Sequence, residues 1–284
     1  MTACRVMDVA VTLSGTPSDR DLLQAADLLA HAIGARLSGV FPVALPSRAA
    51  SPPVANAPSV EEARDRQWEE STDHLEALQG TMTFQSALND FSILERPSRM
   101  LLVDTVAYLR SARVLVASVP SLEWATPFQQ DLFARMMVDS GRPVLVLPKQ
   151  AQLERVPATI MVALGNSPQG TRALSDAMPL LRRARNVYVV TVGHRKDADG
   201  VPANPDPRRL LRDHLDRHGV NARVRTIEPS ELAIGDALIR EAGELGAELI
   251  VAGAFGHSKL REFVFGSTTL ALLEQATTPL LMAH

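Results

Sequence analysis

The chain has 284 residues and carries 29 Lys and Arg against 32 Asp and Glu, so its formal net charge is −3. Its 46% apolar and 21% charged residues are typical of a globular protein and exclude a disordered chain, a collagen and a disulfide scaffold. The slightly acidic balance and the aromatic content of 4% argue against binding of nucleic acid. At roughly 150 residues per domain, this length predicts two domains.

Three features of the sequence bear on the compartment in which the protein acts. The only cysteine, Cys4, cannot form an intrachain disulfide, which favours a reducing environment. The start MTACRVMDVAVTLSG lacks the apolar core of a signal peptide. No segment approaches the ~20 apolar residues needed to cross a bilayer. We therefore expect a cytoplasmic protein that has no membrane partner.

Short apolar segments alternate with helical patterns along the whole chain. In the first half we expect strands at Val9–Leu13, Leu37–Val43, Met82–Leu88, Val114–Ala117 and Val144–Leu147, and helices at Asp19–Ile33, Val60–Leu78, Met100–Arg110 and Phe128–Asp139. In the second half we expect strands at Thr159–Leu164, Asn186–Val192, Ala222–Thr226, Leu249–Ala252 and Pro279–Met282, and helices at Gln169–Arg183, at Pro207–His218, from an N-cap at Ser230 to Leu245, and at Ser267–Gln275. This alternation predicts an α/β fold with a parallel sheet.

The two halves resemble copies of each other. The segment Val116-Ala117-Ser118 matches Val251-Ala252-Gly253 at an offset of 135, whereas Pro17 matches Pro168 at an offset of 151. The difference is close to the length of the Pro- and Ala-rich segment 44–59, which is therefore interpreted as an insertion in the first copy. The repeat predicts one domain at residues 1–150 and another at residues 156–284.

A glycine pattern follows the fourth strand of the second half. Gly253 ends this strand, and Gly256, Gly266 and Ser267 follow with the spacing G-x2-G-x9-G-S. Glycine lets the backbone approach an anion closely, and the helix that begins at Ser267 directs its N–H groups at the loop. Three further loop residues can add positive charge: His257, Lys259 and Arg261. The pattern predicts a phosphate site, although glycines that only end a strand and cap a helix would look the same.

This spacing, together with the order of strands and helices, resembles the universal stress protein family. In that family the segment is the phosphate loop of a nucleotide site. The resemblance implies two tandem, doubly wound parallel sheets of five strands, each in the order 3-2-1-4-5, packed as an intramolecular pseudo-dimer through their fifth strands. It also implies that ATP or another adenine nucleotide binds with its adenine between the first two strands, near Ala163, Gly165 and Val192.

Two departures from the family's pattern limit this expectation. Gly165 stands where ATP-binding members usually carry Asp, so this position offers no charge for Mg²⁺. In the first copy, the corresponding loop after Ala117 has no glycine and contains Pro120 and Pro127, which lack an N–H donor. We therefore expect at most one nucleotide per chain, and a first copy that serves as a structural or partner-binding domain.

The leading hypothesis is a nucleotide-dependent regulator of the stress response that is not a strong catalyst. One alternative is a protein-interaction module of the same fold that has lost nucleotide binding. Association of two chains as a homodimer is also left open. Another is a weak ATP hydrolase, for which Glu262 is the only carboxylate that can be named near the loop.

Other candidate sites in the sequence have simpler explanations. His214 and His218 lie four residues apart on a helix but lack a third ligand, so we expect no metal site. No arrangement of Ser, His and Asp suggests a nucleophilic centre. The acidic pairs Glu61-Glu62 and Glu69-Glu70 are typical of a solvent-exposed helix face.

Overall fold

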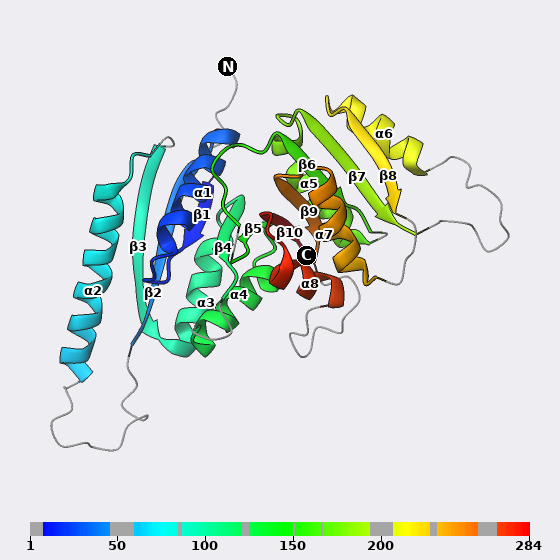
Figure 1. Ribbon diagram of the computed structural model, residues 1–284. Coiled ribbons are helices and arrows are strands. Elements are labelled where there is room, and N and C mark those ends of the chain that lie inside the picture. The colour runs from blue at the N-terminus through cyan, green and yellow to red at the C-terminus, as the bar shows by residue number, and fades with distance from the viewer. Residues whose placement is uncertain are drawn as a thin grey trace. The chain divides into compact units, whose positions relative to one another are not determined.

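The computed structural model describes residues 8–45, 60–84, 87–120, 125–149, 151–165, 167–193, 207–227, 232–254 and 266–284. Within these residues, ten strands and eight helices form two compact units, Met1–Arg142 and Pro143–His284 (Figure 1). None of the helices in the described part of the chain has both the length and the apolar character needed to span a bilayer.

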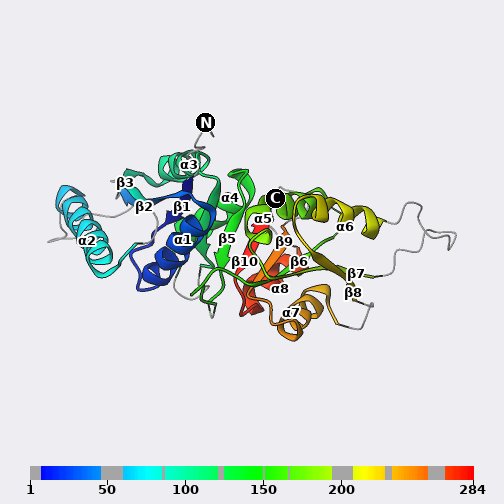
Figure 2. The same cartoon turned by 90° about the horizontal axis from the view of Figure 1, so that it is seen from above.

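Unit 1 contains four parallel strands in the order β3-β2-β1-β4. Its elements are β1 (Asp8–Thr12), α1 (Asp19–Ile33), β2 (Arg36–Leu45), α2 (Val60–Thr81), β3 (Ala87–Pro97), α3 (Ser98–Leu109), β4 (Val114–Ser118) and α4 (Pro127–Asp139). Helices α1 and α2 cover one face of this sheet, and α3 and α4 cover the other (Figure 2). The central strand β1 is therefore buried on both faces, as the burial of the neighbouring residues Val9 and Ala10 shows, since their side chains point to opposite faces.

Unit 2 contains the complete five-stranded sheet that the family resemblance implied. Its elements are β5 (Val144–Leu147), β6 (Thr159–Ala163), α5 (Pro168–Leu181), β7 (Asn186–Val192), α6 (Pro207–Arg217), β8 (Ala222–Ile227), α7 (Ile234–Glu244), β9 (Leu249–Gly253), α8 (Ser267–Gln275) and β10 (Leu280–Ala283). The parallel strands follow the order β8-β7-β6-β9-β10, which confirms the order 3-2-1-4-5. Helices α5 and α6 cover one face, and α7 and α8 cover the other (Figure 2).

The fifth strands of the two sequence repeats pair with each other, as the pseudo-dimer prediction required. Strand β5 runs antiparallel to β10, with Leu145 opposite Leu281. All four residues of β5 are buried, so this pairing protects an apolar strand that would otherwise be an exposed edge. It also places β5 in unit 2, although β5 belongs in sequence to the first repeat. The domain ranges 1–150 and 156–284 remain a prediction from the repeat.

The third strand of the first repeat is a correction to the sequence analysis. We expected it at Met82–Leu88, but β3 is Ala87–Pro97 and pairs with β2 over ten positions, from Arg36 to Leu45. Residues 91–95 are only half-buried, so β3 carries no strong apolar pattern. Tertiary pairing with β2 determines this strand, which is an effect that local sequence cannot show.

The start of α7 is a second correction. We expected Ser230 as its N-cap, but the N-cap is Ala233, and Ser230 lies outside the described residues. The next turn contains Gly235, where an added Cβ would lie 2.5 Å from the Cβ of Ala271 in α8. Glycine therefore lets the first turn of α7 pack closely against α8, and the N-cap Ala233 makes no side-chain hydrogen bond.

Glu248 ties the segment that leads into β6 to the start of β9. Its carboxylate accepts hydrogen bonds from Arg155 Nε at 2.9 Å and from the amides of Ala158 and Thr159 at 2.5 and 3.2 Å. Partial burial raises the pKa of Glu248, but these hydrogen bonds and the charge of Arg155 lower the pKa by more. The net effect is a pKa below the ordinary value, so folding stabilises the ionised form.

We predict that Glu248→Gln lowers the free energy of unfolding by about 1–2 kcal/mol at pH 7, because the charge-assisted bonds are lost. Since the folded-state pKa is depressed, the stabilisation is complete above the unfolded-state pKa of about 4.3 and is lost as the pH falls through the folded-state value. Urea unfolding at pH 7, 5 and 3 should show a difference between the two proteins that shrinks only at pH 3. A difference that does not vary with pH would contradict this assignment.

Candidate functional site

The carboxyl ends of three neighbouring strands bring together residues that the sequence analysis singled out. Ala163 at the end of β6 pairs with Val190 in β7 and with Ala252 in β9. Val192 and Gly253 end β7 and β9, so they lie on either side of β6 at the same edge of the sheet. Open parallel sheets bind ligands at this edge, outside the carboxyl ends of the strands.

Gly253 is needed for packing at this edge. A Cβ at this position would lie 2.5 Å from Gly170 N and 2.7 Å from the carbonyl carbon of Gln169. Both are backbone atoms in the first turn of α5, so only glycine lets α5 approach the end of β9 this closely. Helix packing therefore accounts for Gly253, whether or not a ligand also binds there.

Helix α8 begins at this same edge without a capping side chain. Its N-cap is Gly266, and no side chain among the described residues accepts a hydrogen bond from its first turn. Ser267, the first helical residue, is exposed. The first N–H groups of a helix have no partner within the helix, and the positive end of its dipole adds to their attraction for an anion.

Several residues expected at the site are placed less completely. Gly256 and His257, with Lys259 and Arg261, lie outside the described residues. Gly165 is exposed at the end of β6, and a Cβ there would have only Ser167 Oγ nearby, at 4.0 Å. The position that carries Asp in ATP-binding relatives thus has room for a larger side chain but offers no charge.

Two residues at this edge were missed by the sequence analysis. Gln169 Oε1 is buried and has no hydrogen-bond partner among the described residues. His284 Nδ1 lies 3.2 Å from the carbonyl oxygen of Ala254, the residue that follows β9. Neither residue belongs to the glycine pattern, and only the packing of α5 and β10 brings them here.

The corresponding edge of unit 1 is closed by its own side chains. Helix α4 follows β4 as α8 follows β9, but α4 begins with a complete capping box. Gln129 N donates to Thr126 Oγ1 at 3.3 Å, and Thr126 N donates to Gln129 Oε1 at 2.9 Å. Pro127 has no N–H to offer. The expectation that the loop after Ala117 forms no phosphate nest stays a prediction, since residues 121–124 lie outside the described residues.

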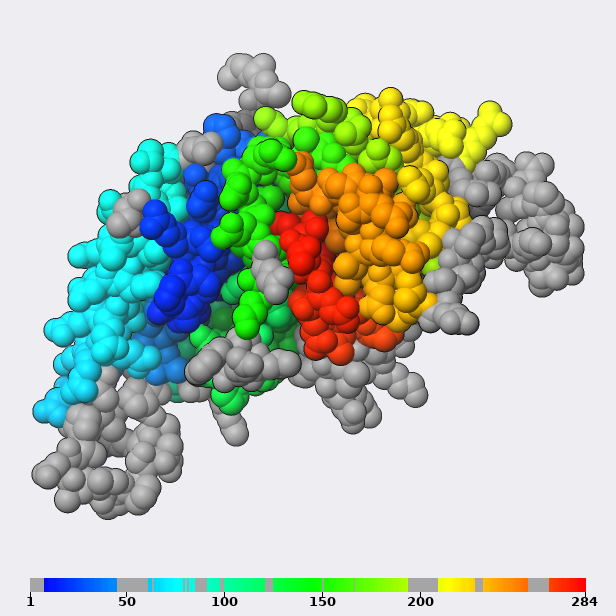
Figure 3. Space-filling model, in the orientation of Figure 1, coloured from blue at the N-terminus to red at the C-terminus, as the bar shows by residue number. Residues whose placement is uncertain are grey.

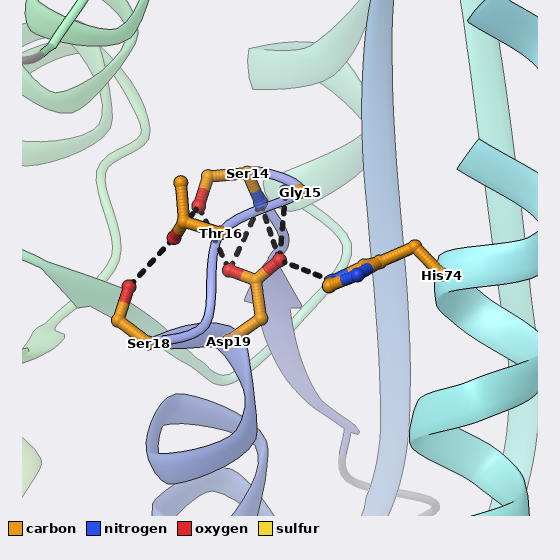
Figure 4. Close-up of polar contacts among 6 residues, drawn as sticks. All are labelled: Ser14, Gly15, Thr16, Ser18, Asp19 and His74. Atoms are coloured by element: carbon orange, nitrogen blue, oxygen red, sulfur yellow. Dashed lines mark hydrogen bonds and ion pairs between the residues drawn. The ribbon is translucent and has the colours of Figure 1, made fainter. Parts of the chain in front are cut away.

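A buried carboxylate occupies the loop after β1 in unit 1 (Figure 4). Asp19, the first residue of α1, is 1% exposed. It accepts hydrogen bonds from Ser14 N at 3.0 Å, Gly15 N at 2.8 Å and Ser14 Oγ at 2.8 Å. His74 of α2 lies with Nε2 at 3.0 Å from Asp19 Oδ2. The N–H groups that could bind an anionic group of a ligand are thus bound to the carboxylate of Asp19.

Unit 2 lacks this internal carboxylate. Strands β1 and β6 correspond at an offset of 151, which places Gly170 where unit 1 has Asp19 and Gly165 where it has Ser14. Glycine has no side chain with which to fill the loop, and no side chain among the described residues accepts a hydrogen bond from Gly165 N. The two units therefore differ at this edge. In unit 1 Asp19 accepts from the amides of Ser14 and Gly15, whereas in the described part of unit 2 Ser167 Oγ accepts from Gly170 N at 3.1 Å and Gly165 N has no side-chain acceptor.

Ser14, Asp19 and His74 form a Ser/Asp/His cluster that the sequence analysis did not find. The carboxylate lies between the other two residues, since Ser14 Oγ and His74 Nε2 both contact Asp19. A nucleophilic triad needs the imidazole next to the hydroxyl, so that it can take up the proton. The order of contacts makes this a structural cluster, which holds α2 against the start of α1.

The other candidates from the sequence have structural roles. The rings of His214 and His218 meet edge to face, with centroids 4.6 Å apart, and Arg182 Nη2 lies 3.2 Å from His218 Nδ1. A neighbouring guanidinium disfavours a metal cation at this position. Across the described residues, no group of three or more His, Cys, Asp or Glu could hold a metal ion.

Comparison with known proteins agrees with this fold. Residues 158–284 match the model of the Universal stress protein family. The chain is 28% identical over 151 residues to the universal stress protein Slr1230 of Synechocystis sp., covering 52% of this chain and 48% of the relative. The match thus spans about half the length of that relative.

Solved structures extend the likeness to nearly the whole chain. A universal stress protein from Archaeoglobus fulgidus has a TM-score of 0.66 at 13% identity and covers 97% of both chains. Protein PA1789 from Pseudomonas aeruginosa PAO1, whose function is unknown, has a TM-score of 0.57 at 14% identity and covers 98% of this chain and 92% of its own. The fold is that of a tandem, doubly wound α/β protein. Residues 158–284 belong to the universal stress protein family, as the glycine spacing predicted.

The contact of Gly253 with α5 predicts that Gly253→Ala destabilises unit 2 by roughly 1–3 kcal/mol, because the new Cβ meets backbone atoms that cannot move aside. Gly243→Ala is the matched control, since Gly243 is exposed in α7 and a Cβ there meets nothing within 4 Å. We expect the control to be neutral or stabilising by up to about 1 kcal/mol, the helix preference of alanine. Urea unfolding measures both, and equal midpoints for the two variants would contradict the packing argument.

The cluster in unit 1 predicts unequal effects of removing Asp19 and His74. Asp19→Ala should cost about 2–4 kcal/mol of unfolding free energy, because it leaves three donors without their buried acceptor. His74→Ala should cost less, about 1 kcal/mol, since His74 is 26% exposed and water can replace it. Thermal and urea unfolding of both variants checks the order, and a larger loss for His74→Ala would show that Asp19 is not the centre of the cluster.

Proposed function

We propose that unit 2 binds one adenine nucleotide, ATP or AMP, at the carboxyl edge of its sheet, and that unit 1 binds none. The protein would then act as a stress-response regulator whose state depends on nucleotide occupancy. The observation that carries this proposal is the contrast between the two copies of one edge. In unit 1 Asp19 and a capping box accept from the N–H groups at this edge. Among the described residues of unit 2, Ser167 caps α5, but no side chain caps α8 or accepts from Gly165 N.

The residues of unit 2 fit the parts of a nucleotide. The uncapped start of α8, with Gly266 and Ser267, suits phosphate oxygens. The buried amide oxygen of Gln169 has no partner among the described residues and can accept a hydrogen bond from a ribose hydroxyl. The backbone near Val192, at the end of β7, is the place that the family resemblance implies for adenine. Gly256 and His257 would complete the phosphate loop.

We propose no catalytic role for this site. Hydrolysis of ATP would require carboxylates that hold Mg²⁺ and a base that activates water. Gly165 supplies no carboxylate at the end of β6, and Asp19 has its counterpart in Gly170, which has no side chain. Binding in the cytoplasm without strong catalysis, as a signal of nucleotide level, is the function that these residues support best.

Two matched variants test the proposal by calorimetric titration with ATP and AMP. Ser267→Ala should weaken nucleotide binding by roughly 0.5–1.5 kcal/mol, because one hydrogen bond at the start of α8 is lost. Thr126→Ala removes the N-cap hydroxyl at the start of α4 in unit 1 and should leave the affinity unchanged. Gly256→Val should abolish binding without unfolding the protein, since its side chain blocks the close approach of the backbone.

The titration also separates the alternatives. We expect a stoichiometry of one nucleotide per chain. Two equal sites would show that unit 1 is not closed. No binding of either nucleotide, by titration and by native mass spectrometry of the purified protein, would favour an interaction module. Release of phosphate from ATP in the presence of Mg²⁺, abolished by Gly256→Val, would favour the hydrolase.

A further inference from the structure

Helix α2 carries an uncompensated acidic face. Its 22 residues include seven Asp and Glu against two Arg, and both arginines lie in its first half. Three exposed carboxylates, Glu69, Asp73 and Glu76, follow one another at spacings of four and three residues, so they share one side of the helix. No ion pair involves any of these three residues within the described part of the chain. Like charges at these spacings repel, which destabilises the helix unless a cation approaches.

The position of these carboxylates makes them more costly. Acidic residues in the first turn, such as Glu61 and Glu62, are favoured by the helix dipole. Asp73 and Glu76 lie in the second half of α2, where the dipole favours cations, and the last turn contains no basic residue. The dipole therefore explains Glu61 and Glu62 but not Asp73 and Glu76. A cationic surface of another molecule would stabilise Asp73 and Glu76.

An exposed tryptophan lies on the same helix. Trp68 precedes Glu69 and is 42% exposed. Tryptophan and arginine are the residues that most often carry binding energy at protein interfaces, and a guanidinium stacks favourably on an indole ring. Because residues one apart on a helix do not face each other, Trp68 borders the acidic side of α2 and does not lie within it. An arginine-rich partner that covers the acidic side could reach the ring at this border.

Unit 2 presents such an arginine-rich surface at the ends of α5 and α6. Arg183 and Arg185 follow α5, and Arg217 ends α6; all three are exposed, and none forms an ion pair within the described residues. The two helix ends are joined, because Arg182 Nε donates to the carbonyl oxygen of His218 at 2.9 Å. The exposed carboxylate of Asp216 offsets only part of this positive charge. We call these three residues the basic helix ends.

The acidic and basic surfaces belong to the different units of one chain. Helices α2 and α6 are the second helix of each repeat, and each lies on the surface of its unit, α2 in cyan and α6 in yellow in Figure 3. Unit 1 has 17 Asp and Glu against 12 Lys and Arg, whereas unit 2 has 15 against 17. Two surfaces of opposite charge on non-equivalent parts of a chain allow heterologous contacts between copies.

We propose that α2 of one molecule binds the basic helix ends of a second copy of this chain. The acidic side formed by Glu69, Asp73 and Glu76 would face Arg183, Arg185 and Arg217, with Trp68 stacking on a guanidinium. The contact is head-to-tail, so it builds rings or open chains rather than a two-fold dimer. It does not involve the proposed nucleotide site and stands independently of the proposed function.

A charge swap tests the proposal with the full chain. Glu69→Lys/Asp73→Lys/Glu76→Lys makes α2 basic, and Arg183→Glu/Arg185→Glu/Arg217→Glu makes the basic helix ends acidic. Each triple variant alone sets like charges against each other and should be monomeric in sedimentation experiments. An equimolar mixture of the two restores opposite charges at both contacts and should associate as the unmodified protein does.

The unmodified protein should show a weight-average mass that rises with concentration above the chain mass of 30.7 kDa at low salt. The association constant should fall at least tenfold in 1 M NaCl, where the Debye length is about 3 Å instead of about 10 Å at 0.1 M. In a Trp124→Phe background, the fluorescence of Trp68 should change over the same concentration range.

A control triple variant, Asp131→Lys/Glu154→Lys/Glu274→Lys, makes the same change in net charge at exposed residues outside α2. It should associate like the unmodified protein, and circular dichroism checks that every variant is folded. The proposal is overturned if the unmodified protein is monomeric at all concentrations. It is also overturned if the control loses association as α2 reversal does, or if the mixture of reversed variants stays monomeric.

Discussion

Backbone N–H groups at the carboxyl edge of a parallel sheet must find acceptors, and the two units of this protein meet that requirement in opposite ways. The strands, the turns after them and the starts of the following helices all direct N–H groups toward this edge. Unit 1 supplies its own acceptors, a buried carboxylate from Asp19 and the capping box of Thr126 and Gln129. Unit 2 has Gly165 and Gly170 in the matching places, and within its described residues no side chain caps α8 or accepts from Gly165 N. These donors are the ones to which the proposed nucleotide would bind.

This difference explains how one fold can serve two purposes within a chain. A unit that binds its own anion gains stability that does not depend on any ligand, because every donor is satisfied once the chain is folded. The unit with open donors is stabilised further when an anion binds, so its stability rises with ligand concentration. The exchange of Asp19 for Gly170 at matching positions removes the internal carboxylate from the loop after the first strand.

The pairing of β5 with β10 determines what the two sequence repeats become in space. Because the fifth strand of the first repeat is buried against the fifth strand of the second, the compact units divide before β5 and not between the repeats. The apolar edge strands β5 and β10 thus pair with each other within the chain. Among the surface helices, α2 and the basic helix ends carry charges of opposite sign.

The sequence by itself determined the alternation of strands and helices, the duplication and the family, since apolar periodicity and the G-x2-G-x9-G-S spacing are local patterns. Helix α1, strand β7 and helix α8 have the expected bounds, because each has a strong period or a clear start and stop signal. Only the tertiary structure decided the position of β3, which pairing with β2 sets, and the close packing of Gly235 in α7 on α8. The same holds for the site. Glycine spacing indicated Gly253 and Ser267, but Gln169, His284 and the contact between Asp19 and His74 join residues far apart in sequence. Only the folded chain brings such residues together, because their contacts depend on packing and not on spacing.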